Sequence, residues 1–235
     1  AVATDYEGIG TSGPHPYLNG PSEARAVVDS VRAARRVVHD AGTRWTAWGY
    51  SQGGHAALWA AQVGAEDAPE LQLLGVAAQA PVTDPSQIRH GGPHITALLV
   101  AGWLASTPDL DGDEVLTDAG RQAVEDAEEV CTVDIDDPDQ VADAGLAGFD
   151  TYIADNVVGN EPATVPVVVF QGSADPLVRA DVTQQAVDRY CAAGGNVELR
   201  TYDGADHLTI VEQSTSDALG WVLDRFAGRP PASTC

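Results

Sequence analysis

Lysine is absent from the sequence: all 12 basic residues are arginine, and they stand against 35 aspartates and glutamates, which gives a net charge of -23. A surface this acidic repels the phosphates of nucleic acids and of anionic membranes. Nucleic-acid binding and attachment to an anionic membrane surface are therefore excluded as predicted functions. Excess carboxylates keep a protein soluble, which is compatible with an exported protein.

Methionine and long hydrophobic runs are also absent. Without methionine, residue 1 is expected to be a processed end or an internal cut, and no signal peptide is visible. The longest apolar cluster, residues 95–105, is interrupted by Thr96 and Gly102. It is shorter than the roughly 18 residues that a membrane-spanning helix needs. The sequence therefore predicts no stable membrane insertion, and a secreted origin is compatible with these features.

Cysteine is scarce, with only Cys131, Cys191 and Cys235 present. Their spacing fits no metal-binding motif such as a CxxC pair, so the sequence predicts no metal centre. An odd number leaves one cysteine without a partner within the chain. Cys235 is the last residue, and a disulfide from it would fasten the tail to the fold.

The residues that are present suit a folded α/β domain. Hydrophobic residues make up 44% of the chain, enough for one sizeable core. Apolar patterning predicts strands at 44–48, 71–80, 165–170 and 196–202, and helices at 22–39, 53–63, 180–193 and 209–226. This alternation indicates βαβ crossovers and a mostly parallel sheet flanked by helices. Residues 1–4 are predicted to be the end of another buried strand.

The alternation stops between residues 84 and 150. This segment contains the apolar cluster 95–105, followed by 14 acidic residues from Asp109 to Asp143 with Arg121 as the only base. We expect an inserted helical cap at 84–150, on a core formed by 1–83 and 151–235.

The acidic clusters at 109–114 and 134–139 raise a calcium site as an alternative. The first cluster begins like a calcium-binding loop, but Glu114 occupies the position where that loop requires glycine. We therefore expect solvated acidic surface at both clusters and no metal.

The strongest local motif is Gly49-Tyr50-Ser51-Gln52-Gly53, a G-x-S-x-G sequence between a predicted strand and a predicted helix. This context is typical of a nucleophile elbow, a sharp turn that holds a serine in a strained backbone conformation. Ser51 is therefore predicted to be a catalytic nucleophile. The backbone N–H of Gln52, at the start of the helix, is the predicted oxyanion donor. Tyr50, beside the serine, is predicted to bind substrate.

A serine nucleophile needs a histidine base and a carboxylate to orient it, in the chain order Ser, Asp, His for such a fold. Asp175 follows the predicted strand 165–170, at the sheet edge where a catalytic acid lies. His207 follows the predicted strand 196–202, whereas the other five histidines precede the nucleophile, lie in its helix or fall in the cap. Asp206 is an alternative acid, but adjacent residues rarely orient each other's side chains, and we expect it to cap a loop.

Candidate substrate contacts also come from the apolar cluster of the cap. Leu98, Leu99 and Trp103 are predicted to line an acyl-chain pocket, or to form a lid that opens at a lipid surface. The alternative is that they only pack the cap onto the core, and both roles can apply to different faces of one helix.

Further motifs extend this pattern over nearly the whole chain. They are Ala3-Thr4-Asp5-Tyr6-Glu7-Gly8, Gly13-Pro14-His15-Pro16-Tyr17 and Ser22-Glu23-Ala24-Arg25, followed by the elbow and by the loops around Asp175 and His207. In order and spacing these motifs resemble the secretory lipase family, which includes Candida antarctica lipase A and many actinobacterial proteins.

The resemblance implies an α/β-hydrolase that cleaves acylglycerols or simpler carboxylic esters outside the cell, without a cofactor and under a cap. It also implies a disulfide between Cys191 and Cys235, and a partner for Cys131 near the family's N-terminus. Family members carry a long N-terminal region with the first strands of the sheet and a loop acid of the oxyanion hole. This region is expected to be missing here, and with it one companion of the Gln52 donor.

The predicted function is a two-step acyl transfer on Ser51, with a lipid or small ester as the substrate. A peptidase or an acyltransferase on the same scaffold is an alternative, because a catalytic triad does not determine the leaving group. A catalytically impaired fragment or a binding module is the alternative from another class, since losing one oxyanion donor costs about 10²–10³ in kcat. The sequence gives no indication of the oligomeric state.

Overall fold

The structure is a computed structural model that describes residues 1–89, 93–129 and 147–235. It divides into two compact units. Unit 1 comprises residues 1–4, 23–83 and 158–235, and unit 2 comprises residues 5–22 and 84–157.

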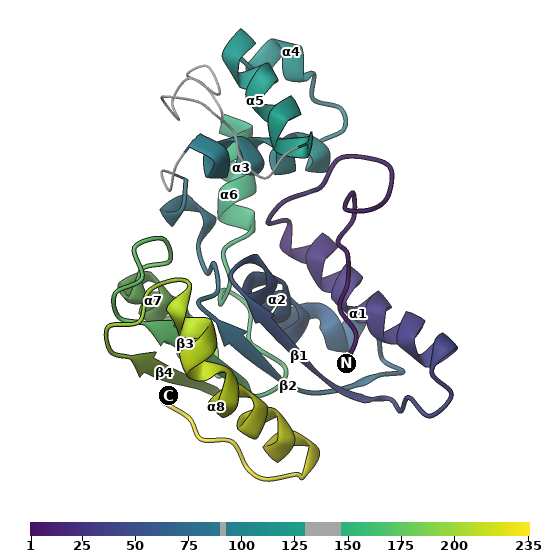
Figure 1. The fold of residues 1–235 in the computed structure, drawn as a ribbon, viewed down its shortest axis with the longest axis vertical. Helices are drawn as coiled ribbons and strands as arrows, with labels where there is room; N and C mark the ends of the chain where they lie inside the picture. Colours follow the sequence, from purple (N-terminus) through teal and green to yellow (C-terminus); the bar gives the residue numbers. More distant parts are fainter. Residues whose placement is uncertain (90–92, 130–146) are drawn as a thin grey trace. The chain divides into compact units, whose positions relative to one another are not determined.

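Unit 1 is built on a four-stranded parallel sheet with the strand order β1-β2-β3-β4 (Figure 1). The strands are β1 (Arg44–Tyr50), β2 (Gln72–Gln79), β3 (Val167–Gly172) and β4 (Val197–Tyr202). The helices of this unit are α1 (Gly20–Val37, from Glu23 onward), α2 (Gln52–Asp67), α7 (Ala180–Ala192) and α8 (Thr209–Phe226). Helix α2 connects β1 to β2, and α7 connects β3 to β4, which are the crossovers that a parallel sheet requires.

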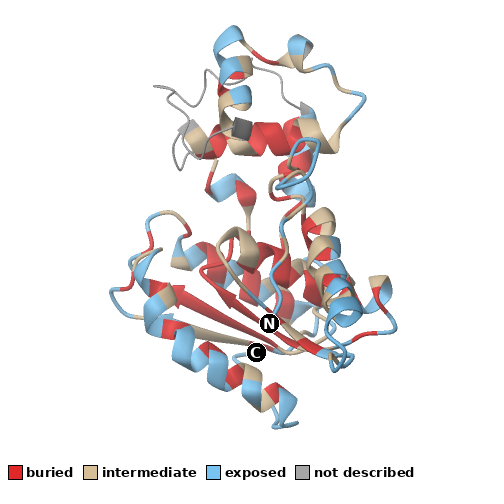
Figure 2. Cartoon of the chain, turned by 45° about the vertical axis from the view of Figure 1, so that its right-hand side comes forward, coloured by how far each residue is buried: buried red, intermediate tan, exposed pale blue. Residues whose placement is uncertain are grey.

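The sheet of unit 1 is covered on both faces. Side chains of β2 and β3 alternate between two apolar clusters: one cluster includes residues of α1, α2 and α7, and the other is closed by α8. Strand β3 is buried along its whole length (Figure 2). A parallel strand covered by helices on both faces has to be continuously apolar, which is why the run Val-Val-Val-Phe occurs here.

Most of the predicted elements of unit 1 are confirmed to within a few residues, and the predicted helix 209–226 coincides with α8. The predicted strand at residues 1–4 is wrong. No strand forms there, and Ala1, Val2 and Ala3 are exposed. A strand exists only where a neighbouring strand accepts its backbone hydrogen bonds, and the ladder β1-β2-β3-β4 does not include this segment.

Unit 2 is helical. It contains a short 3-10 helix, η1 (Pro85–Gln87), and the helices α3 (Pro93–Ser106), α4 (Gly112–Val115), α5 (Asp118–Glu129) and α6 (Ala147–Asp155). Residues 5–22 belong to this unit because long-range hydrogen bonds hold them there. The hydroxyl of Tyr152 donates to the carbonyl of Tyr17 at 2.6 Å, and Asn156 Oδ1 accepts from the N–H of Gly20 at 2.8 Å. The unit therefore extends beyond the segment 84–150 that the composition singles out.

Candidate active site

Ser51 lies in the turn between β1 and α2 with backbone angles of φ 53° and ψ -116°. Such a conformation costs a non-glycine residue on the order of 1–3 kcal/mol, so surrounding contacts must hold it. The N–H of Ser51 donates to the carbonyl of Gln79 in β2 at 3.0 Å, and its own carbonyl accepts from the N–H of His55 at 3.0 Å. A Cβ on Gly49 would lie 1.9 Å from the carbonyl oxygen of Gly53. The sharp turn therefore requires glycine at position 49.

His207 lies in the loop between β4 and α8, and its ring nitrogens contact the other two predicted catalytic residues. Nε2 is 3.0 Å from the Ser51 hydroxyl oxygen, and Nδ1 is 2.7 Å from Oδ2 of Asp175. Because an ionised carboxylate only accepts hydrogen bonds, the proton of neutral His207 lies on Nδ1 and leaves Nε2 as an acceptor. This tautomer is the one that can take a proton from Ser51.

Asp175 follows β3, and its side chain is fully buried. Its oxygens have separate partners: Oδ2 faces His207, whereas Oδ1 accepts from the N–H groups of Leu177 at 2.9 Å and Val178 at 2.8 Å. These hydrogen bonds compensate for the loss of water around the buried charge. They also fix the direction in which Oδ2 points.

The loops that carry Asp175 and His207 are fastened together at the carboxyl ends of β3 and β4. A Cβ on Gly172 would lie 2.3 Å from the carbonyl oxygen of Ala205, so the two loops approach as closely as glycine allows. The N–H of Ala174 donates to the same carbonyl at 3.0 Å. The separation of Asp175 and His207 is thus set by the backbone rather than by their side chains alone.

Asp206 does not take the position of the acid beside His207. Its Oδ1 accepts from the N–H of Leu208 at 3.0 Å, and from the N–H and the hydroxyl of Thr209 at 2.8 and 2.7 Å. The two hydrogen bonds from Thr209 lower the pKa of Asp206. This geometry fits the predicted loop-capping role of Asp206, at the start of α8.

Tyr50, the last residue of β1, contacts the base loop. Its hydroxyl donates to the backbone carbonyl of His207 at 2.8 Å, and the ring centroids of the two residues are 5.0 Å apart. Partial burial, and then the charges of Asp175 and Asp206, raise the pKa of Tyr50. The phenol therefore stays protonated and able to donate at neutral pH. Substrate binding by Tyr50 remains a prediction.

Gln52, the predicted oxyanion donor, is the first residue of α2. Backbone N–H groups in the first turn of a helix point out of its N-terminus, the end that favours negative charge. The side chain of Gln52 points elsewhere: Nε2 donates to Oε1 of Glu23 at 2.8 Å.

The predicted acyl contacts Leu98, Leu99 and Trp103 lie in α3 of unit 2. Leu98 is partly buried, Leu99 is fully buried and Trp103 is 4% exposed. The Trp103 ring packs against Phe149, with centroids 5.6 Å apart. Leu99 and Trp103 therefore contribute to the interior of this unit, and contact with substrate remains a prediction for all three.

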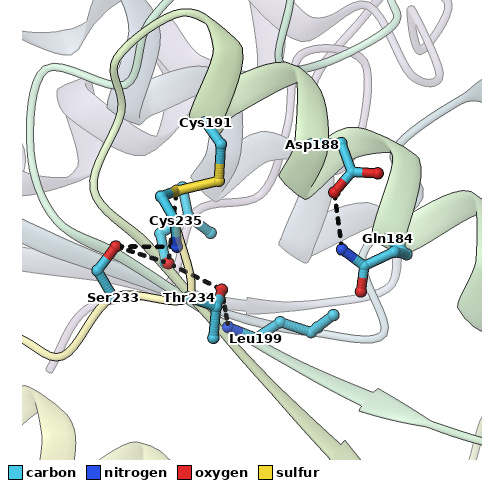
Figure 3. Close-up of a disulfide and its surroundings, with 8 residues drawn as sticks. Gln184, Asp188, Cys191, Leu199, Ser233, Thr234 and Cys235 are labelled. Atoms are coloured by element: carbon cyan, nitrogen blue, oxygen red, sulfur yellow. Dashed lines mark hydrogen bonds between the residues drawn. A yellow bond between two sulfur atoms is a disulfide. The ribbon is translucent and has the colours of Figure 1, made fainter.

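Cys191 and Cys235 form a disulfide, the pair implied by the family resemblance (Figure 3). The tail is also held along β4, because the N–H of Thr234 donates to the carbonyl of Val197 at 2.8 Å. The bond closes a loop with a sequence separation of 44 residues. By loop-entropy arguments such a crosslink stabilises the fold by about 4 kcal/mol. Cys131 lies outside the described residues.

The described residues 1–89, 93–129 and 147–235 contain neither a candidate metal-binding group nor a helix that could span a membrane. No group of three or more histidine, cysteine, aspartate or glutamate side chains there is arranged to hold a metal ion. In the first acidic cluster, Asp111 instead caps α4 by accepting from the N–H of Asp113 at 2.9 Å. The second cluster, 134–139, lies outside the described residues. Within the same ranges, every helix is too short or too polar to cross a bilayer.

Sequence reasoning missed two residues beside the elbow, Glu23 and His55, which are buried and hydrogen-bonded to each other. In the sequence Glu23 stands out only as part of the motif Ser22-Glu23-Ala24-Arg25, and His55 is the histidine that is unsuitable as the base because it lies in the helix after the nucleophile. The helical spacing of Ser51, His55 and Trp59 relates His55 to the nucleophile, whereas no local pattern does so for Glu23.

Comparisons with known proteins show the family of the chain. The chain matches the secretory lipase family over residues 1–136 and 145–234. A probable inactive lipase of Mycobacterium tuberculosis, MT1628, is 31% identical over 93% of this chain and 54% of its own length. Lipase A of Moesziomyces aphidis is 25% identical over 100% of this chain and 56% of its own length. The chain thus spans about half the length of the curated relatives that it matches.

Two solved structures show the fold. Candida antarctica lipase A in its closed state superposes with a TM-score of 0.77 at 21% identity, covering 94% of this chain and 57% of that chain. The rice cell wall degrading esterase LipA of Xanthomonas oryzae gives a TM-score of 0.70 at 19% identity, covering 92% and 67%. With the parallel sheet flanked by helices and the match over nearly all of the sequence, the chain belongs to the secretory lipase family and has the α/β-hydrolase fold.

Proposed function

We propose that the chain is the catalytic part of a secreted serine hydrolase that cleaves carboxylic esters through an acyl-enzyme on Ser51. The observation that carries the proposal is the hydrogen-bonded series from Ser51 through His207 to Asp175. The three residues follow β1, β4 and β3, at the sheet edge where this fold places its catalytic groups.

In the first half of the proposed reaction, the Ser51 oxygen attacks the ester carbonyl while its proton passes to His207 Nε2. The carbonyl oxygen becomes an oxyanion, to which the N–H of Gln52 donates a hydrogen bond. Asp175 stabilises the imidazolium that forms. The tetrahedral intermediate then expels the alcohol, which takes the proton from His207, and the acyl group remains on Ser51.

In the second half, water attacks the acyl-enzyme and gives one proton to His207. The new tetrahedral intermediate breaks its bond to Ser51, and the serine oxygen recovers that proton from Nε2. The carboxylic acid leaves, and the site returns to its starting state. Every step uses side chains and backbone groups of this chain, so the proposal needs no cofactor.

The proposed substrate is an acylglycerol or a simpler carboxylic ester, and the proposed location is extracellular. The family name and the relatives named as lipases support both. The net charge of -23 suits an exported protein that does not attach to anionic surfaces. We propose that unit 2 is the cap and supplies the acyl-chain contacts. Of the three candidate contacts, Leu98, Leu99 and Trp103, Leu98 is the least buried.

A second candidate is a catalytically impaired member of the family. It is favoured by the 31% identity to a protein named as a probable inactive lipase. A peptidase or acyltransferase remains an alternative within the fold, because the arrangement of Ser51, His207 and Asp175 serves any acyl transfer.

Hydrolysis of p-nitrophenyl esters of graded acyl length, by the chain and by Ser51→Ala, tests the proposal. We expect turnover by the chain and loss of at least about 10³ in kcat in the variant, since the nucleophile is removed. A fluorophosphonate probe that reacts with Ser51 gives a second measure. Equal rates for the chain and the variant would refute the proposal, and absence of both turnover and labelling would favour the impaired candidate. Amide and alcohol-acceptor assays separate the peptidase and acyltransferase.

A further inference from the structure

The buried carboxylate of Glu23 bridges two residues of the first turn of α2. Glu23 is 1% exposed and lies in the first turn of α1. Its Oε1 accepts from Gln52 Nε2 at 2.8 Å, and its Oε2 is 2.7 Å from His55 Nδ1. Gln52 and His55 lie one and four residues after the nucleophile Ser51. One side chain of α1 thus contacts the helix turn that begins at the elbow.

The hydrogen-bond partners indicate which tautomer of His55 fits this group. Trp59 Nε1 donates to His55 Nε2 at 3.0 Å, and an indole N–H can only donate. Nε2 of His55 therefore carries no proton, and the proton of the neutral ring lies on Nδ1, from which it is donated to Glu23. In this arrangement both oxygens of Glu23 accept hydrogen bonds. His55 is 0% exposed, and this tautomer satisfies both of its ring nitrogens.

A buried carboxylate is tolerated only when dipoles or hydrogen bonds replace its water. Here the side chains of Gln52 and His55 donate to the carboxylate. Glu23 also lies in the first turn of α1 and against the first turn of α2, where helix dipoles favour negative charge. The contacts to Glu23 restrain Gln52 and His55 together. They therefore restrain the backbone N–H of Gln52, which lies between the fixed turn at Ser51 and the anchored side chain.

We propose that Glu23 is a positioning residue for the oxyanion donor: its buried carboxylate clamps Gln52 and His55 and so fixes the Gln52 backbone N–H beside Ser51. This inference rests on the proposed function. Glu23 acts through Gln52 and does not touch the substrate. Its negative charge does not assist the reaction, because a charge near the oxyanion opposes the charge that develops there. The geometry of the clamp is what matters.

Two substitutions separate geometry from charge. Glu23→Gln keeps the shape, and it can hydrogen-bond both partners once the Gln52 amide is turned over. We expect it to retain kcat to within about threefold. Glu23→Ala removes the clamp, and we expect kcat to fall about 10–100-fold with KM within about twofold, since an oxyanion donor acts in the transition state and its complete loss costs about 10²–10³.

A matched control removes a side-chain hydrogen bond to α2 far from the elbow. The Thr164 hydroxyl donates to the carbonyl of Ala61 at 2.7 Å, so Thr164→Val weakens the anchoring of the same helix elsewhere. Its kcat is expected to match that of the unsubstituted chain. If Glu23→Ala does not fold, Gln52→Ala replaces it, because this variant deletes the clamped side chain and keeps the backbone N–H.

A readout on the resting protein tests the inference independently of catalysis. In ¹⁵N relaxation, the order parameter of the Gln52 N–H is expected to be about 0.85 in the unsubstituted chain and in Glu23→Gln, and to fall toward about 0.6 in Glu23→Ala or Gln52→Ala. A folded Glu23→Ala or Gln52→Ala variant with an unchanged order parameter would overturn the proposal, as would unchanged kcat. If the unsubstituted chain hydrolyses no ester, the proposed function fails and the order parameter alone decides this inference.

Discussion

The phenol of Tyr50 donates a hydrogen bond to the backbone carbonyl of His207 across 157 residues of sequence, at 2.8 Å. The contact joins the end of β1, directly before the nucleophile, to the loop that carries the base. It acts on the backbone of His207, whereas Asp175 acts on the ring. The position of the base relative to Ser51 is therefore held from two directions.

Tyr50→Phe tests the first of these directions, because it removes the hydroxyl and keeps the ring against His207. We expect kcat for p-nitrophenyl butyrate to fall about 3–10-fold through looser positioning of the base, and the free energy of unfolding to fall by about 1 kcal/mol. Tyr202→Phe is the matched control. It removes the hydroxyl that donates to Asp217, away from the base, and should retain activity. Equal kcat values for Tyr50→Phe and Tyr202→Phe would show that the Tyr50 hydroxyl does not position His207.

Asp175→Asn is expected to lower kcat by about 10⁴. The N–H groups of Leu177 and Val178 would keep the amide oxygen on their side, so the amide NH₂ would face His207 Nδ1. The ring would then carry its proton on Nε2, where it cannot take one from Ser51.

Asp206→Asn serves as the comparison for Asp175→Asn, because it changes the neighbouring aspartate in the same way. It should retain most of the activity, since Asp206 caps the start of α8. The steady-state rates of both variants decide between the two aspartates. A larger loss in Asp206→Asn than in Asp175→Asn would reverse the assignment of the acid.

Acid stability depends in part on Asp206, whose pKa is lowered by hydrogen bonds from the N–H and the hydroxyl of Thr209. Because the folded pKa lies below the unfolded value of about 4, the ionised form contributes stability above pH ~4, which is lost as the pH falls through the folded pKa. The other carboxylates are common to the unsubstituted chain and to Asp206→Asn, so the comparison of the two isolates Asp206. In urea unfolding, the difference in free energy between the unsubstituted chain and Asp206→Asn should therefore shrink as the pH falls below about 4. A pH-independent difference would contradict this account.

Local patterning was sufficient to predict the framework of unit 1. The strands β2 and β3 are continuous apolar runs, the elbow is a contiguous motif, and Asp175 and His207 directly follow strands. In a parallel sheet the ends of successive strands meet at one edge, so a one-dimensional pattern places the three side chains near each other. The hydrogen bonds between them follow from loop contacts such as Gly172 with Ala205, which no pattern encodes.

Contacts between distant segments were not predictable in this way. Glu23 and His55 are 32 residues apart on two different helices, and each on its own looks like an ordinary helical residue. Residues 5–22 join unit 2 through long-range contacts such as that between Gly20 and Asn156, 136 residues apart. The strand predicted at 1–4 was wrong because a short apolar run does not specify a neighbouring strand with which it could pair.

The disulfide between Cys191 and Cys235 has a topological consequence for the base. The closed loop contains β4, His207 and α8, but neither Ser51 nor Asp175. A protease that cuts one bond between these two cysteines therefore produces two pieces that remain a single covalent molecule. The piece that carries His207 cannot diffuse away from the piece that carries the nucleophile, so one cut within the closed loop leaves the base tethered to its partners.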